Sequence, residues 1–178
     1  MDKDYLIKQA LQNKRSAQKE LYEMFAPVAY AVIRRYIKDE YDAEDVLIET
    51  FIKVFENLNG FKNEGSFEGW IKKIAVRESL MFLRRNKVFN MLIEVDNINI
   101  SDKITVEDYL GLGDLLKLLD QLPAGYRTVF NLYVIEGYKH NEIAELLGIS
   151  VNTSKSQFRL AKDRLRKLIE EQEKINTA

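Results

Sequence analysis

The sequence contains no cysteine, one histidine and two prolines among its 178 residues. Without cysteine, the chain has neither a disulfide framework nor a thiolate zinc site. The single histidine, His140, lies at the start of a predicted helix, which is typical of a surface or capping residue. No glycine loop that would cradle a phosphate is present. We therefore expect no enzyme activity: no catalytic residue, no metal site and no cofactor.

Long hydrophobic runs are missing as well. Charged side chains interrupt every apolar stretch before the roughly 18 to 20 residues that a membrane span needs, and no signal peptide is visible. The absence of cysteine is typical of proteins in a reducing compartment. We expect a cytoplasmic protein with no membrane insertion.

Helical periodicity dominates what is present, and two prolines with eight glycines leave few turns. The pattern predicts an all-α protein of two small helical domains. In the first domain, the predicted helices cover about 4–11, 16–37, 42–58 and 66–85, with Pro27 as a kink or break in the second.

Residues 88–111 lose the helical period and gain Asn, Asp and β-branched residues, which predicts an extended linker or a short strand. Residues 94–120 carry seven carboxylates and two lysines, so the linker is acidic. Helical pattern then resumes, with Pro123 in the first turn of a helix that reaches about residue 135. We divide the chain into a first domain, 1–87, a linker, 88–111, and a second domain, 112–178.

The most informative stretch is 140–167, which reads as a helix, a tight turn and a second, basic helix. Ile143, Ala144 and Leu147 share one face of the first helix, Gly148 gives the turn its backbone freedom, and Ser150 caps the next helix. These features predict a helix-turn-helix that reads DNA.

The second helix of this motif concentrates positive charge. Residues 152–168 hold six basic side chains and one acidic one, a local charge of +5 in a chain whose net charge is -1. Lys155, Arg159, Lys162 and Arg166 recur at helical spacing on one face, and such a face predicts a polyanionic partner.

A second basic helix ends the first domain, with six basic residues between Lys72 and Lys87 against Glu78 alone. The preceding loop, 61–69, offers glycine flexibility, polar side chains and two phenylalanines as stacking surfaces. This combination predicts a site for single-stranded nucleic acid. The alternative is an exposed amphipathic helix with Phe67 and Trp70 in the hydrophobic core.

Acidic residues cluster between Asp39 and Glu49, where six carboxylates occur without a basic residue. Helical spacing places Asp45, Glu49 and Glu56 outward. They form either a solvated face or a docking surface for a basic protein partner.

In this order, the motifs resemble those of extracytoplasmic-function (group IV) RNA polymerase sigma factors over nearly the whole chain. DAEDVLIETFIKVF at 42–55 resembles the region 2.2 helix, 61–85 resembles regions 2.3 and 2.4, and 119–168 resembles region 4. The resemblance implies a sigma region 2 four-helix domain and a sigma region 4 helix-turn-helix domain. It further implies a transcription initiation factor that binds core RNA polymerase, recognises promoter DNA and opens it, often under an anti-sigma factor.

The resemblance also implies roles for individual residues. The polymerase-binding positions are Asp45, Ile48 and Glu49. The positions for the -10 element are Phe61, Asn63, Ser66, Phe67, Lys72, Lys73, Arg77, Met81, Arg84 and Arg85. The positions for the -35 element are Thr153, Lys155, Ser156, Arg159, Lys162 and Arg166.

Three positions depart from the family's usual pattern. Ile48 stands where Gln is common, so an apolar contact replaces a hydrogen bond to the polymerase. Arg77 stands where Asn is common, and a guanidinium prefers guanine edges or phosphate, so the relatives' -10 preference does not transfer. Ser154 replaces an aliphatic residue, which we expect to loosen the packing of the recognition helix.

Two other functions remain open at this point. One is a dimeric helix-turn-helix regulator that binds operators without polymerase, although no sensing segment is visible. The other is a sigma-like decoy that sequesters a regulatory protein. Dependence of DNA binding on polymerase separates the first from a sigma factor, and run-off transcription separates the second.

Overall fold

The computed structural model describes residues 3–62, 65–86 and 117–176, and every regular element in those ranges is helical. The expected all-α fold is confirmed. The chain forms two compact units, Met1–Leu83 and Arg84–Ala178. The predicted linker, 88–111, and the candidate residue Asn63 lie outside the described residues.

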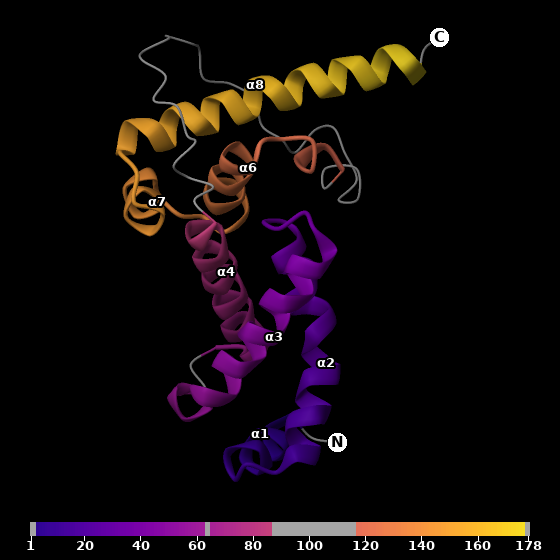
Figure 1. Cartoon of the computed structure of the whole chain (residues 1–178), viewed down its shortest axis with the longest axis vertical. Coiled ribbons are helices and arrows are strands. Elements are labelled where there is room, and N and C mark those ends of the chain that lie inside the picture. The colour runs from indigo at the N-terminus through magenta and orange to yellow at the C-terminus, as the bar shows by residue number, and fades with distance from the viewer. Residues whose placement is uncertain (1–2, 63–64, 87–116, 177–178) are drawn as a thin grey trace. The chain divides into compact units, whose positions relative to one another are not determined.

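Unit 1 contains the four helices that the periodicity predicts (Figure 1). They are α1 (Lys3–Leu11), α2 (Arg15–Arg34), α3 (Glu40–Glu56) and α4 (Phe67–Arg85), with a short 3-10 turn, η1 (Leu58–Gly60), after α3. Helix α2 continues through Pro27 as one element. Of the kink or break that the sequence predicts at this proline, the break is wrong. Buried Phe25 and Ala29 hold the helix in place on either side of Pro27 despite the lost hydrogen bond.

Helix α3 begins where its sequence provides a cap. Asp39 adopts an extended backbone and its Oδ1 accepts the N–H of Asp42 at 3.0 Å. The acidic residues of the first turn also suit the positive end of the helix dipole. Val46 and Val54 are fully buried, so the inward face is the predicted one and the acidic residues are left on the outside.

The core of unit 1 is aliphatic along α2 and aromatic where α2 meets α4. Leu21, Phe25 and Ala29 follow each other at helical spacing on the buried face of α2. The Phe25 ring meets the Phe67 ring edge-on, with centroids 5.3 Å apart. This contact ties the first turn of α4 to the middle of α2.

Unit 2 is built around one long helix, α8 (Val151–Asn176), against which two shorter helices pack (Figure 1). These are α6 (Ala124–Phe130) and α7 (His140–Leu147). Helix α6 runs directly into a π-helical turn, η4 (Asn131–Ile135). The predicted helix to residue 135 therefore exists, but its last five residues are wound more widely than the sequence indicated.

A single apolar cluster holds unit 2 together. Its buried members come from the segment before α6, from α6 and from α8, and half-buried Tyr126, Phe158 and Ile169 pack on its edge. The buried members are Leu118, Leu119, Leu122, Phe130, Ala161, Leu165 and Leu168. Ala161, Leu165 and Leu168 therefore form the buried stripe of α8, and Phe158 lies at its boundary.

We expect Phe67→Ala to lower the free energy of unfolding of unit 1 by about 3–5 kcal/mol, because it empties an aromatic site that is only 1% exposed. Urea denaturation followed by circular dichroism measures this. Tyr41→Ala is the control, since its side chain is 82% exposed and its loss should change stability by less than about 0.5 kcal/mol. Equal effects of the two substitutions would contradict the packing described for Phe67.

Candidate nucleic-acid interface

The turn between α7 and α8 has the geometry that the sequence predicts. Gly148 ends α7 in the left-handed conformation, with φ of 67°, and its N–H donates to the Ala144 carbonyl. The N–H of Ile149 donates to the same carbonyl at 3.1 Å. A side chain at position 148 would be strained by this backbone, although the space around it is open. The chain therefore reverses sharply and starts α8 against α7.

Ser150 caps α8 as expected. Its Oγ accepts the N–H of Thr153 at 2.9 Å and lies 2.8 Å from the Thr153 hydroxyl. Thr153 is only 5% exposed. We had assigned Thr153 to DNA, but its side chain faces the turn and is used to start the helix.

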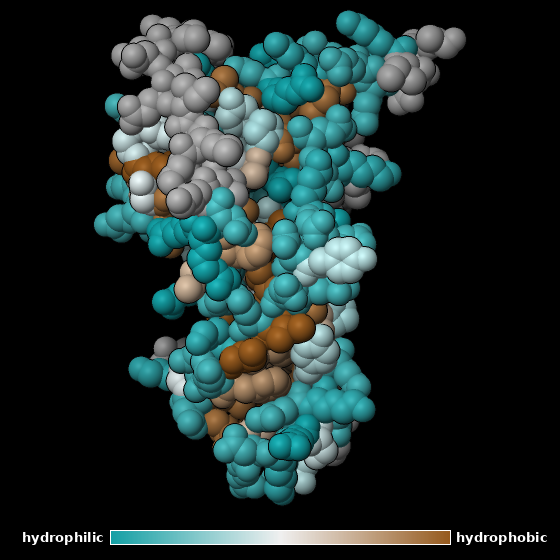
Figure 2. Space-filling view, viewed as in Figure 1, coloured by the Kyte–Doolittle hydropathy of each residue, from teal (hydrophilic) through white to brown (hydrophobic). Residues whose placement is uncertain are grey.

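One side of α8 carries the basic face, which consists of Lys155, Arg159, Lys162 and Arg166 at i, i+4, i+7 and i+11. Lys155 and Arg166 are exposed, while Arg159 and Lys162 are half-buried. The Lys162 ammonium lies 5.1 Å from the centre of the Phe158 ring, a cation–π distance. Ser156, beside the basic face, is half-buried. The part of α8 that is uncovered in Figure 2 shows mostly hydrophilic side chains with apolar ones among them.

His140 is not a simple surface residue. Its ring stacks on Tyr133, with centroids 4.5 Å apart and planes 16° apart, and lies 5.8 Å from Phe158. Its Nδ1 is 2.9 Å from the Oγ of buried Ser154. Burial lowers the pKa of His140, and the charge of Lys155 lowers it further. Ser154 therefore joins α8 to α7 through a polar contact, where we had expected only looser packing.

In unit 1, Phe61 and two aromatic residues of α4 form a cluster. Phe61, Phe67 and Trp70 have ring centroids between 5.0 and 5.6 Å apart. Phe67 is buried, so its ring is not available as the stacking surface that we expected. Phe61 and Trp70 are half-buried. Ser66 Oγ accepts the N–H of Gly69 at 2.9 Å and so starts α4.

The remaining candidates of this basic helix form an exposed stripe on α4. Lys73, Arg77, Met81 and Arg84 follow each other at i, i+4, i+8 and i+11 and are all exposed. Arg85 is exposed at the C-terminal end of α4, and half-buried Lys72 pairs with Glu68 at 2.6 Å. Lys53 on α3 is a further cation that was not among the candidates. Its hydrogen bond with Glu56 raises its pKa, while burial and the charge of Arg77 act against this rise.

Helix α3 presents a mixed apolar and acidic surface. Ile48 is 55% and Ile52 49% exposed, and Asp45 is exposed while Glu49 is half-buried. Tyr41, Asp45, Ile48 and Ile52 share one face by their spacing. Apolar side chains reach the surface over α3 in Figure 2. Tyr41 and Ile52 were not among the candidates, although the same spacing would have found them.

Within the ranges that the structure describes, no group of three or more His, Cys, Asp or Glu side chains is placed to hold a metal ion. Among the same residues, no helix has the length and hydrophobicity to cross a membrane.

Two family models match the chain, one in each half. The model described as Sigma-70 region 2 matches residues 21–88, and the model described as Sigma-70, region 4 matches residues 112–165. The first therefore covers α2, α3 and α4, and the second covers the helix-turn-helix and most of the basic face.

Among curated proteins, the RNA polymerase sigma factor SigV of Bacillus subtilis is 32% identical over 128 residues, which cover 72% of this chain and 76% of SigV. The ECF RNA polymerase sigma factor SigE of Mycolicibacterium smegmatis is 32% identical over 154 residues, 83% of this chain. The matched part spans only 59% of that longer protein. The ECF RNA polymerase sigma factor SigW of Bacillus subtilis is 26% identical over 174 residues, covering 90% of this chain and 93% of SigW.

A solved structure, that of CnrH in complex with the cytosolic domain of CnrY, superimposes with a TM-score of 0.50. The match covers 96% of this chain and 99% of that one at 22% identity. At this identity the similarity concerns the fold.

We expect Ser150→Ala to destabilise unit 2 by about 1 kcal/mol, because the N–H of Thr153 loses its acceptor at the start of α8. Ser150→Asp should retain most of the stability, since a carboxylate also caps. Thermal unfolding followed by circular dichroism measures the effect, with exposed Asn152→Ala as the control. Unchanged melting of Ser150→Ala would show that the cap contributes nothing.

Proposed function

Since the chain belongs to the extracytoplasmic-function sigma factors of the sigma-70 family, we propose that it binds core RNA polymerase and directs it to promoters. In this proposal, it recognises the -35 and -10 elements and helps to open the DNA. The chain supplies binding energy and the polymerase performs the chemistry, so the protein is not itself an enzyme. Such a factor acts beside RNA polymerase in the cytoplasm.

The observation that carries the proposal is the combination of three surfaces in one chain. Helix α3 has an acidic and apolar face. Helix α4 has an exposed basic stripe and follows an aromatic loop in the sequence, and α8 has a basic face and follows a capped turn. They occur in the order of the two matched family models. We assign the parts to residues 1–87 and 112–178, with 88–111 as the acidic linker.

The polymerase-docking surface that we propose is the α3 face with Asp45, Ile48 and Glu49, to which we add Ile52. Exposed Ile48 and Ile52 offer apolar area for burial. The carboxylates at its edge attract and orient a basic partner. Ile48 thus replaces a polar contact with an apolar one at the centre of this surface.

For the -10 element, we propose that Phe61 and the adjoining loop, with Asn63, hold an unstacked base. Lys72, Lys73, Arg84 and Arg85 contact phosphates, and Arg77 with Met81 face the bases. Ser66 and Phe67 do not contact the DNA in this proposal. Ser66 caps α4 and Phe67 fixes its first turn in the core, so both hold the reading residues in position.

For the -35 element, we propose that Lys155, Ser156 and Arg159 enter the major groove near the start of the recognition helix, while Lys162 and Arg166 follow the backbone. We do not include Thr153 among these DNA-contacting residues, because its hydroxyl is hydrogen-bonded to Ser150 in the turn.

Regulation by an anti-sigma factor is also proposed. CnrH, whose fold resembles this one, was solved with the cytosolic domain of CnrY. A dimeric regulator that works without polymerase and a decoy remain the competing functions. Reconstitution with purified core polymerase on a genomic DNA library, with mapping of transcript ends, separates them. Discrete start sites that require this protein support the sigma function, whereas operator binding without polymerase, or no start sites, contradicts it.

We expect the double variant Lys155→Ala, Arg159→Ala to lose about 10- to 100-fold of run-off transcription from promoters that need a -35 element, because both cations lie on the basic face. The matched control is Arg164→Ala, Lys167→Ala, which removes the same charge from the same helix away from that face. Equal losses in both double variants would indicate a general charge effect and reject the assignment.

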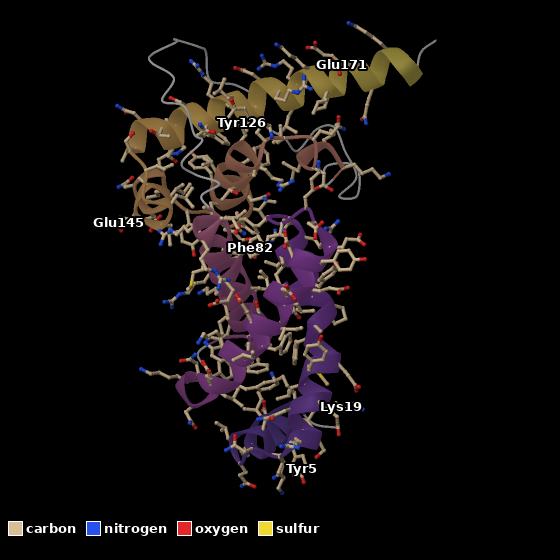
Figure 3. The ribbon with its side chains drawn as sticks, viewed as in Figure 1. Tyr5, Lys19, Phe82, Tyr126, Glu145 and Glu171 are labelled. Atoms are coloured by element: carbon tan, nitrogen blue, oxygen red, sulfur yellow. The ribbon has the colours of Figure 1, made fainter. Side chains whose placement is uncertain are left out.

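We expect Asp45→Lys to weaken binding to core polymerase by about tenfold, since it reverses a charge on the docking surface. Glu171→Lys makes the same change near the C-terminal end of α8, where the exposed side chain is labelled in Figure 3. Fluorescence anisotropy of labelled protein titrated with polymerase at moderate salt measures both affinities. Unchanged affinity of the Asp45 variant would remove α3 from the proposed interface.

A further inference from the structure

The contact between α7 and α8 contains a feature that neither helix needs for its own stability. His140, in the first turn of α7, approaches Ser154, in the first turn of α8, with 2.9 Å between Nδ1 and Oγ. Ser154 is completely buried. One residue further along α8 stands Lys155, on the basic face. The contact therefore fixes the first helical turn of α8, next to the residues that we propose to contact the -35 duplex.

The direction of this hydrogen bond follows from its surroundings. Ser154 is completely buried, and the partner that the structure gives its hydroxyl is His140 Nδ1. If the imidazole donated this bond, the buried O–H would have no acceptor, so the hydroxyl is the donor. A neutral His140 accepts this bond at Nδ1, whereas a protonated ring has donors at both nitrogens and cannot accept it.

The surroundings also disfavour a positive charge on the ring. Lys155 approaches from α8, and Lys162 of the same helix lies over neighbouring Phe158. Lys139 precedes the ring, the start of α7 is the positive end of that helix, and Glu142 is engaged with the N–H of Lys139 at 2.7 Å. From η4, the group that faces His140 is the stacked ring of Tyr133. Neutral imidazole therefore fits the site.

We propose that the Ser154–His140 hydrogen bond is a joint that positions the basic face of α8 for the -35 duplex, and that protonation of His140 opens the joint. This inference rests on the proposed function for its effect on promoters, but the joint itself does not. His140 and Ser154 are positioning residues and do not touch DNA.

The sign of the pH dependence follows from the pKa of His140, which burial and Lys155 hold below its ordinary value of 6.5. His140 is therefore protonated at a higher pH in the unfolded chain than in the folded chain. Stability linked to His140 is therefore complete above pH 6.5 and is lost as the pH falls toward the lower pKa of the folded state. The joint is therefore closed while His140 is neutral and opens as the pH falls through this lowered pKa.

The first experiment is an NMR titration of the imidazole, which is unambiguous because the chain has one histidine. In Ser154→Ala, the pKa of His140 should rise toward 6.5, since a hydrogen bond that favours the neutral ring is gone. Ser79→Ala is the matched control: it also removes a fully buried serine hydroxyl, one bonded to the Ala75 carbonyl at 2.8 Å in unit 1. An unchanged or lower pKa in Ser154→Ala overturns the joint.

The second experiment measures promoter discrimination by the reconstituted holoenzyme. It compares run-off from a promoter found with the wild-type protein and from the same promoter with its -35 element replaced. At pH 7.5, Ser154→Ala should lose about two- to tenfold of this discrimination, the worth of one hydrogen bond, and Ser79→Ala should lose none. Discrimination by Ser154→Ala equal to wild type overturns the positioning role.

Two substitutions of the histidine complete the test. His140→Phe keeps a ring against Tyr133 but cannot accept the bond, so its discrimination should be reduced and independent of pH. His140→Asn offers an uncharged oxygen near the Nδ1 position and should retain more discrimination than the Phe variant, also without pH dependence. Wild-type discrimination should fall toward that of His140→Phe as the pH is lowered through the pKa of His140 that the NMR titration measures. A wild-type to His140→Phe ratio that does not change with pH overturns the switch.

If the wild-type holoenzyme does not discriminate between the promoters at all, the proposed -35 function is rejected together with the effect of the joint on it. The titration of Ser154→Ala still decides whether the joint exists.

Discussion

The rotation of α8 about its own axis is the constraint on which the DNA-reading half of this protein depends. Ala161, Leu165 and Leu168 must be buried against Phe130 and the leucines that precede α6. Burying apolar area is the dominant stabilising term in folding, so the helix has little freedom to turn. As a consequence, the basic face keeps Lys155 and Arg166 exposed and Arg159 and Lys162 half-buried. The charges do not orient the helix; the apolar stripe orients the charges.

In unit 1, apolar packing likewise orients α4 and thereby places its cations. Its exposed stripe carries the cations, but the helix is held through Phe67, which meets Phe25, Phe61 and Trp70. An aromatic residue beside a proposed base-binding loop therefore belongs to the scaffold and keeps its neighbour Phe61 in place. In both units a capping serine fixes the first turn of the basic helix: Ser66 before α4 and Ser150 before α8.

Charge separation makes this arrangement compatible with a chain of net charge -1. The acidic residues of α3 sit at the start of a helix whose dipole favours them, and the cations occupy α4 and α8. Affinity for a polyanion is then local, and the acidic surface is left for a protein partner. The joint between His140 and Ser154 adds a polar contact where the reading helix α8 packs against α7.

The sequence by itself determined the helices, their inward faces, the Gly148 turn and the cap at Ser150, because these follow from local backbone chemistry and from helical periodicity. It also placed the basic face of α8, since spacing alone puts Lys155 and Arg159 together. Only the tertiary structure decided that Phe67 is core, that Thr153 serves the turn, and that α2 passes through Pro27 unbroken. It also decided that His140 meets Ser154, fourteen residues away. Those outcomes depend on which side chains meet across helices, and contacts between helices carry no periodic signal in a single sequence.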